Sequence, residues 1–135
     1  MIYSDFKFIQ PILTKAHFDM FPVDGEPDRE VSINLKKNVL HISGEKKAVL
    51  SVTVCLNQLD NDNSRKNIPF TAEVEMQSIF SWSQELSNDE INTFLYQNAT
   101  ALLLSYIRPV IAILTASSPL PTYNMPFLNL TVQDD

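Results

Sequence analysis

Few residues of this chain have the types and spacing that catalysis or metal binding requires. His17, His41 and Cys55 show no metal-ligand spacing to one another. Cys55 alternates with apolar neighbours, which is typical of a small core residue, and no base stands beside it to activate the thiol. Glu73 and Glu75 share one face of a predicted strand, where paired carboxylates can do acid–base chemistry but more often keep a solvated face soluble. We therefore predict no catalytic residue, no metal site, no cofactor and no enzyme activity.

The composition indicates one ordinary globular domain over residues 1–135. Apolar residues make up 44 % and charged residues 19 % of the chain, enough to build a core without disulfides or metals. The formal net charge of -6 argues against nucleic acid or an anionic membrane as the partner. The single cysteine excludes an intramolecular disulfide.

The location that we expect is cytoplasmic. The N-terminus lacks the basic and then apolar pattern of a secretory signal. The longest uninterrupted apolar run, residues 101–104, is far too short to cross a bilayer, so we expect no membrane insertion.

The first half of the chain reads as strands. Apolar and polar residues alternate over residues 31–36, 48–57 and 70–77, with Phe70, Ala72, Val74 and Met76 predicted to face inward. The N-terminal segment is also strand-like, although Pro11 limits it to an edge or a bulge. Residues 59–67 are polar and read as a turn or loop. Hairpin-length links between the four predicted strands favour an antiparallel meander.

The second half predicts one long helix over residues 86–118. Ser87 and Glu90 have capping-box spacing, and apolar residues then recur every three to four positions. Pro109 should kink the helix or mark a junction between two helices. The expected fold class is α+β, a four-stranded antiparallel sheet with one long C-terminal helix packed on it. Because the helix is apolar almost all round and the sheet covers one side, we infer a second subunit that packs helix against helix.

An apolar strip with three prolines follows the helix, within residues 117–135. It contains Leu120, Tyr123, Met125, Phe127 and Leu128, and its prolines exclude both a helix and a regular strand. Two interpretations stay open. The strip either packs over an exposed flank of the helix or forms one wall of an extended groove for unfolded polypeptide.

Two motifs and a third, weaker one carry a family resemblance. The stretch "FTAEVEMQSIF", residues 70–80, is similar to the fourth-strand motif of SecB, the bacterial cytosolic chaperone of protein export, with Ser78 in place of a usual glycine. In residues 105–130, Tyr106, Arg108, Pro121 and Asn124 match the family pattern around its long helix and proline strip. Phe18 and Asp19 fall on the Phe-Glu pair that ends the family's first strand.

The resemblance implies an ATP-independent chaperone, a holdase, that binds unfolded polypeptides or preproteins in an apolar groove and passes export substrates to SecA. It implies a homo-oligomer, a dimer or a dimer of dimers, that is, a homotetramer. The groove residues that it suggests are Met76, Phe80, Leu120, Tyr123, Met125, Phe127 and Leu128. The acidic surface for SecA would include Asp19 and Glu73, although Lys15 falls where the family has Asp. SecB proteins continue into a second helix and a tail that contacts SecA, so a SecA contact is expected to be reduced here.

Two further functions stay open from the sequence. SecB-like proteins also guard unstable antitoxins of toxin–antitoxin pairs, which would make an antitoxin the partner. A hotdog-like domain that binds a small ligand or acts as a thioesterase would also combine a sheet with a long helix.

Overall fold

A computed structural model describes residues 6–23, 25–26, 30–58, 68–126 and 128. The predicted groove residue Phe127 and the polar stretch 59–67 lie outside these described residues. The elements along the chain are β1 (Lys7–Phe8), β2 (Ile12–Met20), β3 (Ile33–His41), β4 (Lys47–Leu56), β5 (Phe70–Ser81), α1 (Asn88–Thr93), the π-helical segment η2 (Phe94–Ala99) and α2 (Thr100–Ala116).

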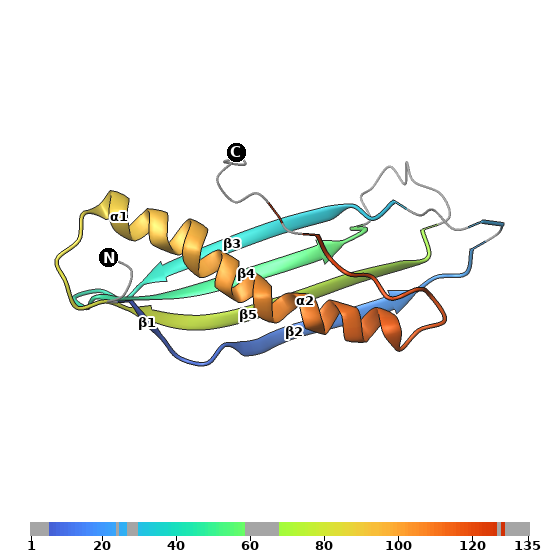
Figure 1. Ribbon diagram of the computed structural model, residues 1–135, viewed down its shortest axis with the longest axis horizontal. Helices are drawn as coiled ribbons and strands as arrows, with labels where there is room; N and C mark the ends of the chain where they lie inside the picture. The colour runs from blue at the N-terminus through green and yellow to red at the C-terminus, as the bar shows by residue number, and fades with distance from the viewer. Residues whose placement is uncertain (1–5, 24, 27–29, 59–67, 127, 129–135) are drawn as a thin grey trace.

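The strands form one antiparallel sheet in the order β1–β5–β4–β3, and β2 pairs with β5 on the same edge as β1 (Figure 1). The predicted α+β class, with a sheet and one long C-terminal helix, is confirmed, and the two-residue β1 is an additional strand. A meander is right for β3, β4 and β5, but the first long strand joins β5 rather than β3. Alternation indicates which face of a strand is buried, and it does not indicate which strand lies alongside.

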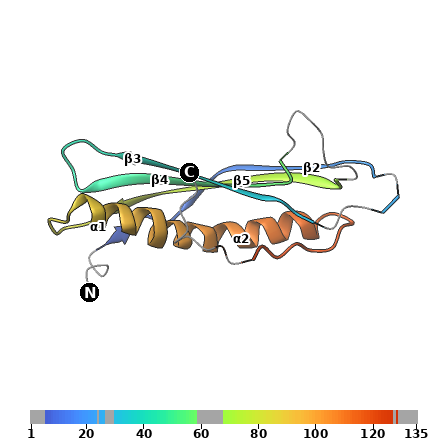
Figure 2. The same cartoon turned by 90° about the horizontal axis from the view of Figure 1, so that it is seen from above.

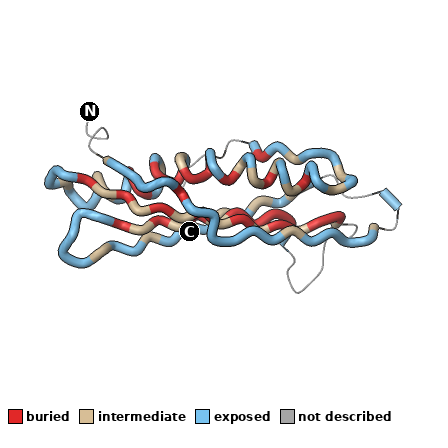
Figure 3. Tube along the Cα trace, turned by 90° about the horizontal axis from the view of Figure 1, so that it is seen from below, coloured by how far each residue is buried: buried red, intermediate tan, exposed pale blue. Residues whose placement is uncertain are grey.

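The core lies between the helix and the two central strands. Along β5 every second residue from Phe70 to Phe80 is buried, and β4 alternates in the same way from Ala48 to Val54. The outer strand β3 is half-buried on this face, and β2 is almost entirely exposed (Figure 3). The helix therefore covers the centre of the sheet best. This agrees with the prediction that alternate residues of β5 face inward.

The helix begins with the predicted capping box. Ser87 Oγ accepts the Glu90 N–H at 3.1 Å, and a Glu90 carboxylate oxygen accepts the Ser87 N–H at 3.1 Å. Of the two outcomes expected at Pro109, the junction between two helices is wrong, because α2 continues through Pro109 as one element, and the kink stays a prediction. Pro109 and Ser105, whose carbonyl loses its partner, are both exposed, so water can satisfy that carbonyl. The departure from regular α-helix lies earlier, in η2, where Thr100 Oγ1 donates to the Leu95 carbonyl at 2.9 Å.

The helix lies diagonally across one face of the sheet (Figures 1 and 2). Leu103, Ile107 and Ile111 are buried, whereas Tyr106 and Ile113 remain exposed. By length and composition the helical run Asn88–Ala116 could cross a membrane, a property that it shares with the core helices of soluble proteins. Here the buried side of the run belongs to the core that it forms with β4 and β5.

Candidate polypeptide-binding surface

The proline strip folds back along α2 and is tied to it by hydrogen bonds. The buried Thr115 Oγ1 accepts the Tyr123 N–H at 2.8 Å and donates to the Ile111 carbonyl at 3.1 Å. Arg108 Nε donates to the carbonyl of Met125 at 3.0 Å, and the Met125 side chain is only 2 % exposed. The strip therefore takes the first of the two paths expected from the sequence, over a flank of the helix.

The structure places the predicted groove residues in or against the core of the protomer. Met76, Phe80 and Met125 are buried there, and Leu120, Tyr123 and Leu128 are half-buried and packed on the same cluster. A polypeptide can reach the first three only if the packing around them opens. Their role in binding polypeptide stays a prediction.

The apolar surface of β5 continues onto exposed residues of the edge strands. Leu13 of β2 pairs with Met76, and Phe8 of β1 pairs with Phe80, with 6.0 Å between the two ring centroids. Cross-strand partners share a face of the sheet, so both residues lie on the helix side. Leu13 and Phe8 are each 46 % exposed.

The helix adds apolar residues on the flank that faces away from the strip. Arg108 and Thr115 hold the strip on one flank, and Tyr106 and Ile113, seven residues apart, lie on the other. Ile113 is 65 % exposed. We call Phe8 and Leu13, the exposed residues of the edge strands on the helix side, together the edge surface.

Sequence patterns did not single out the edge surface, although Phe8 and Leu13 are large apolar residues in predicted elements. Alternation and helical spacing assign such residues to a core. Their exposure follows from the edge position of β1 and β2, which pair with β5 alone among the described strands.

The residues predicted for a translocase-motor partner lie on the opposite face of the sheet. Asp19 pairs with Thr71 and His17 with Glu73, on the side of β5 that alternates with its buried residues. The Glu73 carboxylate forms an ion pair with Lys15 Nζ at 3.4 Å. Lys15 thus offsets part of the acidic charge that Asp19 and Glu73 would present to a basic partner.

The same face brings together three residues that are far apart in the sequence. His17, Glu73 and Cys55 occupy one cross-strand row, with Glu73 between the other two. Burial raises the pKa of the Cys55 thiol, and the Glu73 carboxylate raises it further. This shift disfavours the nucleophilic thiolate, so the row does not activate the cysteine. Among the described residues no group of histidine, cysteine, aspartate or glutamate side chains could hold a metal ion.

Comparison with known proteins agrees with this fold. The sequence profile of the SecB family, described as preprotein translocase subunit SecB, matches residues 5–132. The chain belongs to the SecB family. The family consists of soluble chaperones without enzyme activity, so the protein is a chaperone-class protein and not an enzyme. No curated protein sequence matches the chain.

Two solved structures share the fold. A SecB-like chaperone from Mycobacterium tuberculosis, in complex with a ChAD peptide from an antitoxin, superposes with a TM-score of 0.73 at 16 % identity, over 93 % of this chain and 92 % of that chain. A protein of unknown function from Streptococcus agalactiae has a TM-score of 0.53 at 13 % identity, over 90 % of this chain and 97 % of that chain. These similarities support the SecB-like fold expected from the sequence.

Proposed function

We propose that this protein is an ATP-independent holdase that binds unfolded polypeptides or preproteins through exposed apolar side chains. The observation that carries the proposal is the edge surface, where Phe8 and Leu13 stay exposed beside the buried residues of β5 on a SecB-family fold. An exposed apolar area that continues a buried face of a sheet indicates an interaction site. Full burial of one such side chain is worth roughly 1.5–3 kcal/mol, so several partial burials give useful affinity without sequence specificity.

The proposal includes a cytoplasmic homo-oligomer, a dimer or a homotetramer built as a dimer of dimers, of a single SecB-like domain over residues 1–135. Two observations support assembly. Ile113 is exposed on the flank of α2, and β2 and β3 each pair with only one long strand within the described sheet. A free edge and an apolar helix flank are both surfaces that a second copy can cover.

The SecB family suggests two classes of client, export substrates and antitoxins. A role in protein export needs an acidic surface for SecA, and Lys15 pairs with Glu73 where that surface was predicted. The similar chaperone from Mycobacterium tuberculosis was solved with an antitoxin peptide. Guarding an antitoxin is therefore the second candidate function. Co-purification with SecA and with antitoxins is the comparison that separates the two.

The holdase proposal is tested by the light-scattering mass of the protein, alone and mixed at low temperature with a reduced protein that cannot refold. We expect a stable complex with the unfolded chain and none with its folded form. Leu13→Glu should weaken the complex about tenfold or more, because a buried carboxylate is costly. Asn38→Glu, on the opposite face, is the matched control and should bind as the parent does.

Each outcome separates one part of the proposal from the rest. Equal binding by Leu13→Glu and the parent would remove the edge surface as the binding site. If Leu13→Glu loses the oligomer as well as the complex, then the edge surface is a subunit contact. If the parent ignores the unfolded chain, then the protein shares the SecB fold without holdase activity.

A further inference from the structure

A row of apolar side chains crosses the sheet on the face turned away from the helix. Leu40 of β3 lies opposite Val49 of β4, and Val49 lies opposite Ile79 of β5. Ile9, just after β1, donates its N–H to the Ile79 carbonyl at 3.1 Å and extends the row to the sheet edge. Leu40 is 64 % and Ile9 58 % exposed. Single exposed apolar residues are normal, but a continuous row indicates a contact surface.

The Ile79 end of this row opens into a hollow of about 280 Å³. The apolar lining consists of Phe8, Ile9, Ile42 and Ile79, so an aliphatic side chain can bury surface there. The charged lining consists of Lys7, Lys47 and Glu45. Two lysines and one glutamate give the lining a net charge of +1, in a chain whose formal net charge is -6. The hollow therefore has the opposite sign to the protein as a whole.

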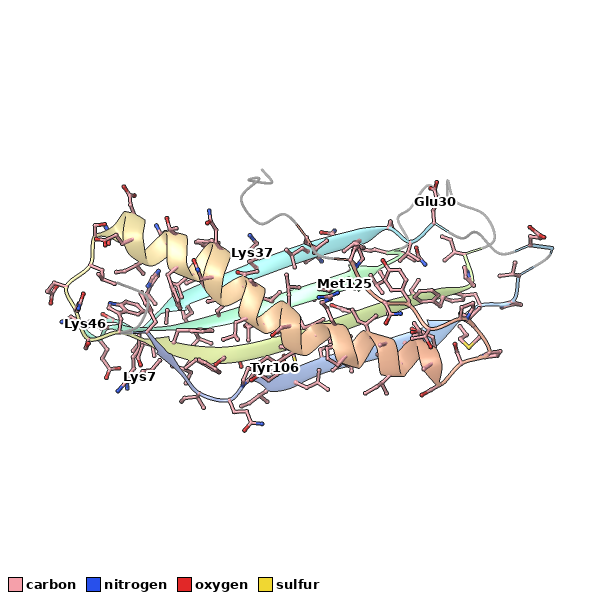
Figure 4. The ribbon with its side chains drawn as sticks, in the orientation of Figure 1. Lys7, Glu30, Lys37, Lys46, Tyr106 and Met125 are labelled. Carbon is pink, nitrogen blue, oxygen red and sulfur yellow. The ribbon has the colours of Figure 1, made fainter. Side chains whose placement is uncertain are left out.

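Lys7 and Lys47 both pair with the same residue of β5, Ser81. Lys7 pairs with Ser81 from one side and Lys47 pairs with Ser81 from the other, so the two ammonium groups lie on one face on either side of β5. Lys47 meets Glu45 at 4.0 Å, and both side chains are about half exposed, which makes this a weak ion pair. The neighbouring Lys46, at the same end of the molecule as Lys7 (Figure 4), contacts Glu85 at 2.8 Å.

We propose that this hollow docks an extended peptide segment of a partner protein in which an aliphatic side chain stands next to a carboxylate. The aliphatic side chain would pack on the isoleucines, and the carboxylate would lie between Lys7 and Lys47. Ammonium groups at the edge of an apolar contact select the sign of the partner's charge and set its register. Phe8 of the edge surface also lines the hollow, whereas Leu13 does not, so Leu13→Glu should weaken the holdase complex and leave peptide docking unchanged.

The test is a fluorescence anisotropy titration of the full-length protein with a labelled peptide of alternating isoleucine and glutamate. A peptide of the same length with lysine in place of glutamate is the matched probe. We expect the glutamate peptide to bind and the lysine peptide to bind at least tenfold more weakly. Lys7→Glu and Lys47→Glu should each lower the affinity about tenfold. Lys46→Glu changes the net charge equally without lining the hollow, and its effect should stay below about twofold.

Three results would overturn the proposal. The two peptides could bind equally, which would show apolar adsorption without charge recognition. Lys46→Glu could weaken binding as much as Lys47→Glu does, which would show that the peptide responds to the overall charge of the protein and not to the lysines of the hollow. An excess of reduced, unfolded protein could displace the peptide, which would place it on the holdase site. Peptide binding that survives this competitor, in a protein that also holds the unfolded chain, supports both proposals separately.

Discussion

At the scale of single residues, Thr115 controls the path of the strip after the helix. Its hydroxyl accepts the Tyr123 N–H and donates back into the last turn of α2. The buried Thr115 hydroxyl therefore gives a hydrogen-bond acceptor to the Tyr123 N–H, which the prolines of the strip keep from pairing in a sheet. Burial raises the pKa of the Tyr123 phenol, which agrees with a strip that packs on the protein.

Thr115→Val should loosen the strip around Tyr123 without unfolding the sheet, because Arg108 and the buried Met125 still hold the strip on α2. The substitution keeps the side-chain volume and leaves the Tyr123 N–H without its acceptor, which costs about 1–3 kcal/mol. Hydrogen exchange at the Tyr123 amide should accelerate, and urea unfolding should report the lower stability. Thr100→Val is the control, because Thr100 bonds only within the helix in the contacts described. Similar exchange at Tyr123 in both variants would contradict this role for Thr115.

Cys55 should react slowly and gain reactivity only at high pH. Burial and the Glu73 carboxylate raise the thiol pKa above the ordinary 9.0. The folded state therefore favours the neutral thiol, and the stability contributed by this group falls as the pH rises above 9.0. Alkylation by iodoacetamide between pH 7 and about 10 measures the shift. Glu73→Gln removes the carboxylate charge and should speed alkylation at each pH, and an unchanged rate would rule out its electrostatic effect.

At the scale of elements, Asn57 joins three strands at one end of the sheet. Its side-chain oxygen accepts the Ser32 N–H at 3.1 Å and its amide donates to the Phe70 carbonyl at 3.1 Å. Its backbone N–H donates to the Ser32 carbonyl at 2.9 Å, with a φ of 54°. Asparagine suits both tasks, because it tolerates the left-handed conformation and carries a donor and an acceptor.

Asn57→Ala and Asn57→Gly separate these two tasks. Both variants lose the side-chain hydrogen bonds and should be destabilised by about 1–3 kcal/mol. Alanine is also strained at positive φ, so Asn57→Ala should be less stable than Asn57→Gly by about 1 kcal/mol. Urea unfolding of the two variants and the parent measures both differences. Equal stability of the two variants would show that the backbone conformation relaxes.

At the scale of the whole molecule, a protomer with an open edge and an apolar helix flank should assemble. We expect a dimer or tetramer of the 15.3 kDa chain by light scattering. Ile113→Asp should reduce the mass toward that of one chain, because a carboxylate cannot be buried between two helices without a partner. Since Ile113 is largely exposed in the protomer, folding should survive the change. Ser43→Asp, in the exposed turn after β3, is the control, and an assembly that tolerates Ile113→Asp would place the contact elsewhere.

Local patterns in the sequence already determined the buried faces of β4 and β5, the capping box at Ser87 and the single long helix. These features depend on residues within a few positions of one another, through side-chain alternation, helical spacing and caps. The motifs in β5 and around the strip were also sufficient to identify the SecB family.

Only the tertiary structure decided which distant segments meet. It placed β2 beside β5, aligned His17 with Glu73 and Cys55, and set Lys7 and Lys47 on either side of Ser81. It also buried Met76 and Phe80 beneath the protomer's own packing while leaving their partners Leu13 and Phe8 exposed. The physical reason is that strand partners are chosen by the packing of the whole sheet, over separations at which alternation and helical spacing carry no information.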